Sequence, residues 1–187
     1  MRPAPDRRHF LRRSAHLLLP ALPGAAALAA APAWAAPGPG PRALSLAHTH
    51  TGERLQLVYA ADGGYLPDSL TVLNRFLRDH YTGQVGTMDP PLFDLLHRVR
   101  GLLGSDAPFE VISGYRCADT NERLRRSGGG GVARRSLHMD GRALDVRLRG
   151  VPLAELRDAA WSLQAGGVGF YPGEQFVHLD TGRVRRW

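Results

Sequence analysis

From about residue 44 onward, the chain is a series of short segments whose apolar residues either alternate or recur at helical spacing. Alternating or apolar runs predict strands at residues 44–46, 55–59, 108–113, 143–148, 168–171 and 175–180. Helical spacing predicts helices that begin near Pro67, after Asp89-Pro90-Pro91 and at Pro152, and a short polar helix is expected over residues 119–126. These elements do not alternate as β-α-β units. We therefore expect an α+β domain with a small, mainly antiparallel sheet and flanking helices.

Two positions in this pattern carry expectations of their own. Asp89 directly precedes the prolines of the second helix and is its expected N-cap. His48 and His50 fall near the turn of the first hairpin. Two histidines at this spacing can bind a metal, but we expect them to be surface residues at the strand end.

The first 36 residues have the pattern of an export signal. Arg7-Arg8-His9-Phe10-Leu11-Arg12 is a twin-arginine pattern, an apolar run follows to about residue 31, and Ala33-Trp34-Ala35 is typical of a cleavage site. We expect a twin-arginine-type signal peptide over residues 1–36, a Pro/Gly-rich linker over 37–43 and one folded domain over 44–187. The apolar run contains two prolines and is short for a bilayer span, so no stable span is expected in the mature protein. The predicted location is the periplasm or cell envelope.

Charge and cysteine content exclude two further classes. The whole chain has 24 basic and 17 acidic residues and a net charge of +7. Residues 1–36 hold five arginines and Asp6, so the remainder has 19 basic and 16 acidic residues and a net charge of +3. That charge is too small to indicate a nucleic-acid partner. Cys117 is the only cysteine, so no disulfide can form within one chain.

The side chains best suited to binding a metal lie between Ser136 and Asp145. His138 and Asp145 are seven residues apart, and Gly141 allows the chain to turn between them. His178, near the C-terminus, is the best candidate for a third ligand. A catalytic Zn²⁺ usually takes three protein ligands of these types and a water. From spacing alone, the alternatives remain a hydrogen-bonded or surface histidine and an aspartate paired with an arginine.

Three motifs together resemble a known group of zinc peptidases. They are Ser113-Gly114-Tyr115-Arg116, Ser136-x-His138-x-x-Gly141-x-Ala143-x-Asp145 and Phe176-Val177-His178-Leu179-Asp180. The combination resembles the zinc D-alanyl-D-alanine peptidase and hedgehog-like metallopeptidase group, and is most similar to its periplasmic murein endopeptidase, or MepK-like, branch. The resemblance extends from about residue 44 to residue 187 and includes Leu73-Asn74-x-x-Leu77-Arg78-Asp79-His80.

This resemblance implies a fold of the hedgehog and D-Ala-D-Ala-peptidase type, with Zn²⁺ held by His138, Asp145 and His178. It implies hydrolysis of peptide cross-links in peptidoglycan, with the meso-diaminopimelate to meso-diaminopimelate link as the expected target. Arg116 matches a position beside the metal, where a guanidinium can stabilise negative charge on the carbonyl oxygen. The alternative role for Arg116 is a structural salt bridge.

The motifs also suggest residues that shape the site. Ser113 and Tyr115 belong to the same motif as Arg116 and are expected to form part of the pocket. Ser136 is placed to hydrogen-bond a metal ligand. Their contribution is expected to be to the geometry of the site and to substrate binding.

The general base is where the sequence departs from the group. Many of these peptidases carry a catalytic glutamate three residues before the last histidine, and here that position is Gln175. An amide cannot accept a proton at neutral pH, so two other candidates remain, Asp180 and Glu174. Asp180 shares a strand face with His178 and has the alternative role of orienting a ligand or an arginine.

Three functions follow from these residues. The first is a zinc-dependent endopeptidase that acts on the stem peptides of peptidoglycan and remodels the cell wall. The others are a D-alanyl-D-alanine carboxypeptidase with the same metal chemistry and a non-catalytic cell-wall-binding module, which the mismatch at Gln175 suggests. Arginines that flank a glycine-rich stretch can contact an acidic polymer or form a solvated face; they are Arg123, Arg125, Arg126, Arg134 and Arg135.

Overall fold

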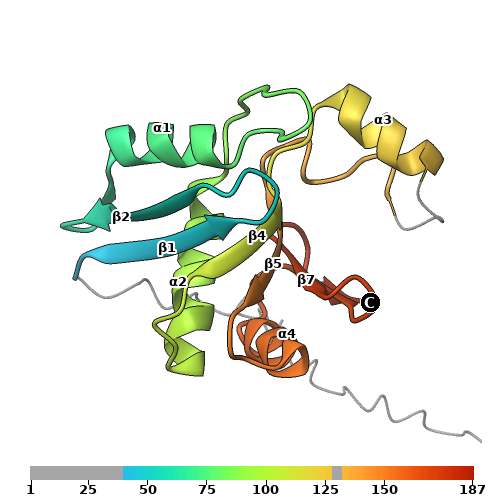
Figure 1. Cartoon of the computed structure of the whole chain (residues 1–187). Coiled ribbons are helices and arrows are strands. Elements are labelled where there is room, and N and C mark those ends of the chain that lie inside the picture. Colours follow the sequence, from blue (N-terminus) through green and yellow to red (C-terminus); the bar gives the residue numbers. More distant parts are fainter. Residues whose placement is uncertain (1–39, 128–131) are drawn as a thin grey trace, which may run out of the picture. The chain divides into compact units, whose positions relative to one another are not determined.

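The computed structural model describes residues 40–127 and 132–187, so the expected signal peptide and most of the expected linker lie outside the described residues. Within these ranges the strands form one eight-stranded sheet in the order β3-β2-β1-β4-β5-β7-β6-β8 (Figure 1). The strands are β1 (Arg42–His48), β2 (Arg54–Ala61), β3 (Gly64–Tyr65), β4 (Phe109–Ser113), β5 (Ala143–Leu148), β6 (Gly167–Tyr171), β7 (Phe176–Asp180) and β8 (Arg185–Arg186). Neighbouring strands are antiparallel except for the parallel pairs β1–β4 and β6–β8, so the mainly antiparallel sheet is confirmed.

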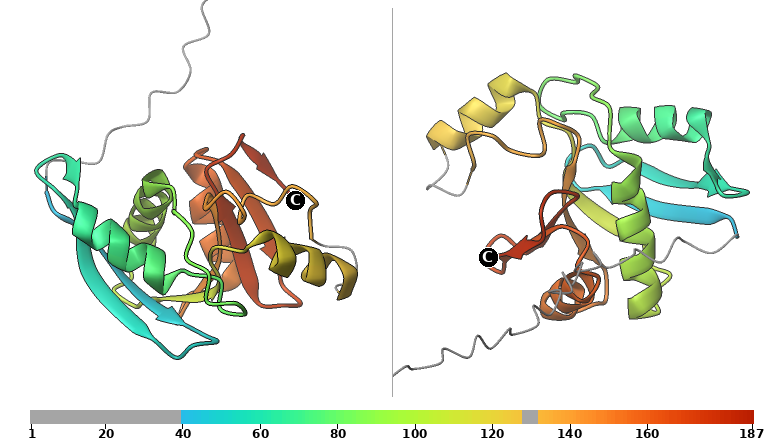
Figure 2. Two further views of the ribbon diagram at one scale, coloured as in Figure 1. Left: turned by 90° about the horizontal axis from the view of Figure 1, so that it is seen from above. Right: turned by 180° about the vertical axis from the view of Figure 1, so that it is seen from behind.

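The helices found in the described residues occur at the predicted places. They are α1 (Pro67–Phe76), α2 (Pro90–Leu103), α3 (Ala118–Ser127) and α4 (Leu153–Ser162). Helices α2 and α4 contact each other, and they contact β1 and the β6–β7 pair respectively. In Figure 2 the yellow helix α3 lies apart from α2 and α4. The prediction of an α+β fold is therefore confirmed.

The core forms where the apolar helix faces meet the sheet. Helix α2 buries one stripe, which consists of Leu92, Phe93, Leu95, Leu96 and Val99. Full burial of such a side chain contributes about 1.5–3 kcal/mol relative to exposure. Helix α3 buries only Thr120 and Asn121, both polar, so its packing contributes little to this core. In the part of the chain that the structure describes, no helix has the length and apolar character needed to span a membrane.

The strand structure begins earlier than the expected domain start. Arg42 is the first residue of β1, and it is buried at 7% exposure. Its Nε lies 3.0 Å from Asp94 Oδ1, and Asp94 also accepts hydrogen bonds from the hydroxyls of Tyr59 and Tyr65. The last two residues of the expected linker therefore belong to the sheet, because this ion pair fixes them against α2.

Asp89 stands at the N-cap position of α2, but its side chain does not cap the helix. Its carboxylate instead accepts a hydrogen bond of 2.5 Å from Thr181, directly after β7. Its backbone N–H donates to the carbonyl of Gly141 at 2.9 Å. Gly141 has φ +66°, and a Cβ there would lie 2.0 Å from the Thr87 carbonyl oxygen. Gly141 therefore allows the predicted turn and also a close approach of the chain before β5 to the residues that precede α2.

The prediction that His48 is a surface residue is wrong. His48 is 2% exposed, because the loop after α1 places His80 over it with ring centroids 5.4 Å apart. His48 Nδ1 accepts from the His50 backbone N–H, so the proton is on Nε2, which has no hydrogen-bond partner in the described structure. His50 is exposed as predicted and stacks on His80 at 4.2 Å. Burial lowers the pKa of His48 to about 4, with a further contribution from His80 and His50.

This burial predicts a loss of stability in mild acid. The unfolded chain binds a proton at His48 near its usual pKa of 6.5, whereas the folded protein does not until about pH 4. Lowering the pH from about 7.5 to about 5 should therefore reduce the free energy of unfolding by about 2 kcal/mol through this residue. Urea unfolding at both pH values measures the effect. The variant His48→Leu should show a smaller pH dependence by that amount, and equal pH dependence in the two proteins would contradict the prediction.

Candidate metal centre

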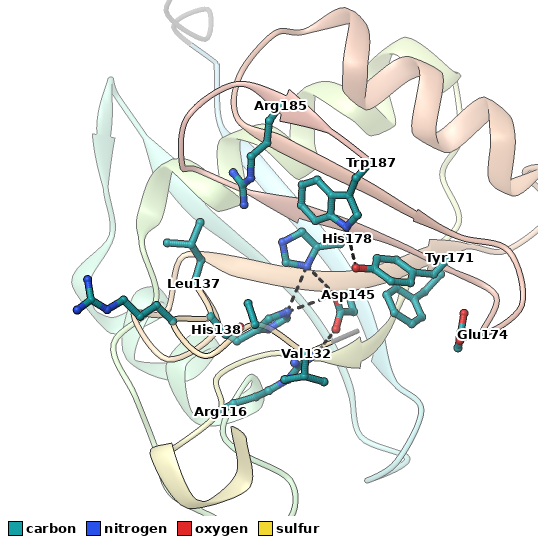
Figure 3. Close-up of a pocket in the computed structure, with 14 residues that line it drawn as sticks. Arg116, Val132, Leu137, His138, Asp145, Tyr171, Glu174, His178, Arg185 and Trp187 are labelled. Atoms are coloured by element: carbon teal, nitrogen blue, oxygen red, sulfur yellow. Dashed lines mark hydrogen bonds and ion pairs between the residues drawn. The ribbon is translucent and has the colours of Figure 1, made fainter. Parts of the chain in front are cut away.

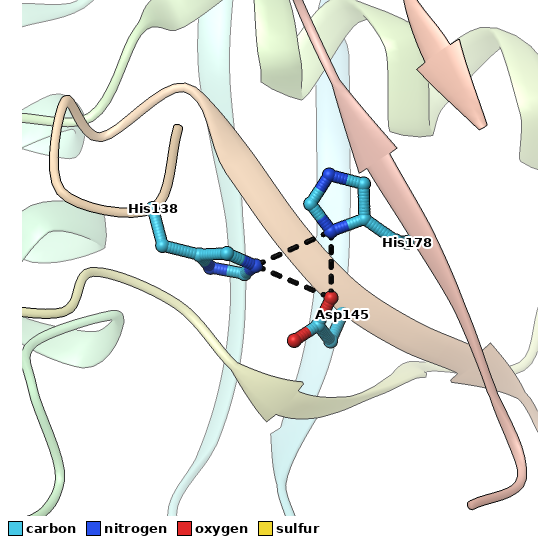
Figure 4. A group of neighbouring side chains, drawn as sticks. All are labelled: His138, Asp145 and His178. Atoms are coloured by element: carbon cyan, nitrogen blue, oxygen red, sulfur yellow. Dashed lines mark hydrogen bonds and ion pairs between the residues drawn. The ribbon is translucent and has the colours of Figure 1, made fainter. Parts of the chain in front are cut away.

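Two adjacent strands and a turn bring the predicted ligands together. In the pairing of β5 with β7, Asp145 lies directly opposite His178, and in the pairing of β4 with β5 it lies opposite Ser113. Directly opposed residues on one face of an antiparallel pair are close neighbours. His138 comes from the turn that leads into β5 and points at the same place (Figure 4). The sheet register thus brings a strand pair and a turn to one point.

The three side chains offer one ligand atom each to a common centre. His138 Nε2 lies 3.2 Å from Asp145 Oδ1 and 3.3 Å from His178 Nδ1. His178 Nδ1 lies 2.9 Å from Asp145 Oδ1. Ligands at about 2.0–2.1 Å from a tetrahedral Zn²⁺ are about 3.3 Å from one another, so the cluster fits such an ion with little movement. Among the described residues, this is the group of His, Cys, Asp and Glu side chains that could hold a metal ion.

The outer nitrogen of each imidazole fixes which nitrogen faces the centre. His138 Nδ1 lies 2.7 Å from the Gly114 carbonyl oxygen, which can only accept, so Nδ1 carries the proton and Nε2 is free. His178 Nε2 lies 3.0 Å from Asp180 Oδ2, so Nε2 carries a proton and Nδ1 is the nitrogen left to bind a metal. A partner of this kind orients a metal-binding histidine and increases its basicity.

Asp180 is fully buried behind His178 and has no free oxygen directed at the centre. Its Oδ1 accepts from the backbone N–H groups of Gly167 and Gly182 and from Arg185 Nη1. Its Oδ2 accepts from His178 and from Arg185 Nη2 at 2.8 Å. This geometry does not support Asp180 as the general base. It favours the alternative that the sequence left open, in which Asp180 orients a ligand and an arginine.

Arg116 lies beside the cluster and contacts it directly. Its Nη2 donates to Asp145 Oδ2, the carboxylate oxygen that does not face the centre. Its Nε donates to Ser113 Oγ at 2.8 Å, which positions the guanidinium. Arg116 therefore forms the predicted salt bridge and stands next to the metal position at the same time, so the structure is compatible with both roles.

Burial and neighbouring charges tune the protonation of the cluster. Burial opposes the charge on Asp145, but His138, His178 and Arg116 together outweigh it and hold the pKa of Asp145 well below its usual range. Burial lowers the pKa of His138. Burial also acts on His178, but its hydrogen bonds to Asp145 and Asp180 outweigh this and raise its pKa. Since Nε2 is bonded to Asp180, the second proton that His178 gains lies on Nδ1, which faces Asp145 Oδ1. A metal must displace this proton, so metal binding is expected to weaken as the pH falls.

A pocket of about 290 Å³ opens over the cluster (Figure 3). Glu174 and Tyr171 line it on one side of the cluster and Leu137 on the other. Ser136 also lines the pocket, but in the ranges 40–127 and 132–187 its hydroxyl has no hydrogen bond to a ligand candidate. The predicted pocket residue Tyr115 does not line it.

Tyr115 packs elsewhere in the fold. A Cβ on Gly86 would lie 2.2 Å from its ring, and its backbone N–H donates to the Leu77 carbonyl oxygen at 2.8 Å. These contacts place the side chain against the loop that follows α1. Tyr115 therefore supports the segment that carries Arg116 from behind.

Gln175, at the position of the expected glutamate, turns away from the pocket. It adopts φ +60° in the turn between β6 and β7, and its side-chain amide donates to the Pro172 carbonyl oxygen. Glu174 lies on the same turn and does line the pocket. Position 175 therefore differs from the expected glutamate in two ways. Its side chain is an amide, and the turn holds that amide against Pro172, where it does not line the pocket.

Comparisons with known proteins identify the family of the chain. A family model described as peptidoglycan L,D-endopeptidase MepK matches residues 36–187. The chain belongs to this family. The peptidoglycan L,D-endopeptidase MepK of Escherichia coli K12 is 45% identical over 137 residues, which are 73% of this chain and 75% of that protein. The resemblance to the MepK-like branch is thereby confirmed.

A second curated relative matches to a similar extent, and one solved structure matches part of the chain. The probable peptidoglycan L,D-endopeptidase MepK of Haemophilus influenzae is 46% identical over 138 residues, which are 73% of this chain and 74% of that protein. The crystal structure of Serratia marcescens L-Ala D-Glu endopeptidase ChiX is 25% identical, covers 41% of this chain and 62% of that chain, and gives a TM-score of 0.32.

Two side chains that border the cluster, Trp187 and Arg185, were not predicted from the sequence. Trp187 lies 5.4 Å from His178 between ring centroids, and its Nε1 donates to the Tyr171 hydroxyl at 2.7 Å. Arg185, the partner of Asp180, also lies over the Trp187 ring at 4.8 Å. The sequence shows Tyr171 two positions after Gly169 on the predicted hairpin. No local pattern indicates that Trp187, at the end of the sequence, packs against this tyrosine.

Removing the charge of Asp180 should weaken metal binding by this MepK-family chain. In Asp180→Asn, the amide no longer offers two acceptor oxygens, so His178 loses its fixed orientation. Loss of such a partner reduces metal affinity by about 10–100-fold. Competition with a chromophoric zinc chelator measures the affinity. Asp158→Asn, which alters an exposed pair with Arg157, is the matched control and should keep wild-type affinity. Wild-type affinity in folded Asp180→Asn would contradict this role.

Proposed function

We propose that this chain is a zinc-dependent murein endopeptidase that hydrolyses peptide cross-links of peptidoglycan, with the meso-diaminopimelate to meso-diaminopimelate link as substrate. The observation that carries the proposal is the convergence of His138, Asp145 and His178 in the pocket of a MepK-family chain. Two imidazoles and a carboxylate form a donor set suited to Zn²⁺. The MepK relatives are themselves named peptidoglycan L,D-endopeptidases.

The proposed roles follow from the contacts of each side chain. When bound by His138, Asp145 and His178, Zn²⁺ supplies an acidified water and a Lewis acid for the scissile carbonyl. Asp145 and Arg116 neutralise each other in the resting site. The remaining N–H groups of Arg116 then donate to the carbonyl oxygen as it gains negative charge. Asp180 acts through His178 as a positioning residue.

The proton of the attacking water needs an acceptor. Asp180 is saturated with donors, and Gln175 is an amide that faces the turn. Glu174 lines the pocket, and within the described parts of the chain its carboxylate has no hydrogen bond or ion pair. Glu174 is therefore the proposed general base, reaching the reacting water through a further water molecule in the pocket.

The pocket supports an endopeptidase over a carboxypeptidase. It extends on both sides of the cluster, toward Glu174 on one side and toward Leu137 on the other (Figure 3). An endopeptidase must accept peptide on both sides of the bond that it cleaves. A carboxypeptidase needs a closed side with a group for the terminal carboxylate. The substrate is accordingly proposed to be the cross-linked stem peptide.

The proposed location is the cell envelope, since peptidoglycan lies there. The twin-arginine pattern at Arg7-Arg8 supports export of the folded protein by that route. Fusion of residues 1–36 to a reporter that is active only after twin-arginine export tests this part of the proposal. A lysine pair at Arg7 and Arg8 should block the export.

Loss of one ligand should abolish both metal binding and cleavage. His138→Ala removes one of three donors, and the expected result is less than one metal ion in ten proteins and no detectable products. Metal content is measured by elemental analysis. The substrates are muropeptides with one defined cross-link, either the meso-diaminopimelate to meso-diaminopimelate (3–3) link or the D-alanine to meso-diaminopimelate (4–3) link, and the products are separated by chromatography. His50→Ala, an exposed histidine outside the pocket, is the control and should behave as the wild type.

Three outcomes distinguish the candidate functions. Cleavage of 3–3 cross-links by the wild type and not by His138→Ala supports the proposal. Release of terminal D-alanine in place of cross-link cleavage indicates a carboxypeptidase. Zinc-loaded wild-type protein that binds sacculi and cleaves nothing indicates a binding module and overturns the proposal.

A further inference from the structure

Tyr171 lies on the same face of the hairpin as the ligand candidate His178. In the pairing of β6 with β7, Gly169 is opposite His178 and Tyr171 is opposite Phe176. Residues two apart on a strand point to the same face, so Tyr171 follows Gly169 on the face that carries His178. Figure 3 shows the Tyr171 hydroxyl directed toward the cluster, beside His178. The strand register therefore places a phenol at the edge of the proposed reaction centre.

The absence of a side chain at Gly169 makes room for this arrangement. A Cβ there would lie 2.8 Å from atoms of the Trp187 indole and 2.8 Å from the Tyr171 ring. Both backbone groups of Trp187 form hydrogen bonds with β6. Its N–H donates to the Val168 carbonyl oxygen at 3.3 Å, and its carbonyl oxygen accepts from Phe170 at 3.0 Å. The indole is thus fixed between His178 and Tyr171.

The hydrogen bond between the two side chains decides where the Tyr171 proton points. An indole N–H can only donate, so at 2.7 Å from Trp187 Nε1 the Tyr171 oxygen is the acceptor. The Tyr171 hydroxyl must then donate its own proton elsewhere. Among residues 40–127 and 132–187, no acceptor for it is found. Because Tyr171 lines the pocket, the hydroxyl is left free to donate to a substrate there.

We propose that the Tyr171 hydroxyl is a catalytic hydrogen-bond donor to the scissile carbonyl oxygen, and that Trp187 is the positioning residue that aims it. This inference rests on the proposed function. When water adds to the carbonyl carbon, the π electrons move to the oxygen, which becomes a stronger acceptor. The C–N bond then breaks, and the amine leaves with a proton that comes from the water. Tyr171 keeps its proton throughout and stabilises the charged oxygen from the side opposite Arg116.

The contacts of the other donors explain why a second one is useful. Arg116 already donates to Ser113 and Asp145, so part of its charge is committed to the resting site. The Tyr171 hydroxyl accepts from Trp187 but donates to no other group within the described residues. A fixed donor that meets its acceptor only as charge develops stabilises the transition state more than the bound substrate.

The variant Tyr171→Phe removes the hydroxyl and keeps the ring, which stacks on Phe176 at 4.6 Å. Loss of one such donor lowers kcat by about 100-fold. KM for a 3–3 cross-linked muropeptide should stay within a factor of about two, since the contact forms as the reaction proceeds. Tyr81→Phe removes a phenol hydroxyl outside the pocket and is the matched control, with wild-type kcat expected.

A binding measurement gives a readout that does not depend on turnover. The probe is a phosphinate analogue of the 3–3 link, whose tetrahedral, negatively charged group mimics the reacting carbonyl. Tyr171→Phe should weaken its binding by the same factor of about 100, while zinc affinity stays at the wild-type value. Equal affinity for the phosphinate in both proteins would overturn the assignment.

Trp187 is tested by a double-mutant cycle. Trp187→Phe keeps an aromatic ring but removes the N–H, so the freed Tyr171 hydroxyl can rotate and kcat should fall by about 3–10-fold. In the Tyr171→Phe background the same change should have no further effect on kcat. If the two substitutions lower kcat by factors that multiply in the double variant, the positioning role of Trp187 is wrong.

The outcomes separate this inference from the function on which it rests. If the wild type cleaves no muropeptide, the proposed function fails. If the wild type cleaves the 3–3 link and Tyr171→Phe cleaves it at the same rate, the proposed function stands and the role of Tyr171 is wrong.

Discussion

The buried carboxylate of Asp145 is the group on which the rest of the site depends. It is 3% exposed, and an ionised carboxylate at such a depth is unstable unless charges and hydrogen bonds compensate it. Arg116, His138 and His178 provide the compensation, and they come from the segment after β4, the turn before β5 and strand β7. The need to satisfy one charge therefore fixes three separate segments against one another.

The same logic continues outward from the cluster. Asp145 contacts His178, His178 contacts Asp180, and Asp180 contacts Arg185, so acidic and basic groups alternate from β5 to β8. Each member holds the next in one orientation, and the donors around Asp180 leave it no other arrangement. A site prepared in this way needs little reorganisation when a metal or a charged reaction intermediate arrives.

Local patterns in the sequence predicted the elements and the ligand candidates, because burial of one strand or helix face leaves a periodic signal. The two-residue strands β3 and β8 are too short to give such a signal. The parallel β1–β4 pairing joins segments about sixty residues apart, and the burial of His48 depends on a loop that packs over it. Tyr171, Trp187 and the saturated state of Asp180 were invisible for the same reason. They depend on which distant groups meet, and a single sequence does not report this.

The ligand candidates all come from one continuous stretch, residues 138–178, in which β5, α4, β6 and β7 follow one another. The segment that precedes this stretch contributes Val132, Ala133, Arg135, Ser136 and Leu137 to the lining of the pocket. The strands β1–β3 reach the ligand-bearing strands only through β4. The ligand candidates and the pocket residues that precede them thus occupy consecutive segments of the chain. A change in the length of the segment before His138 would therefore alter one wall of the pocket and leave the order of the ligand-bearing strands as it is.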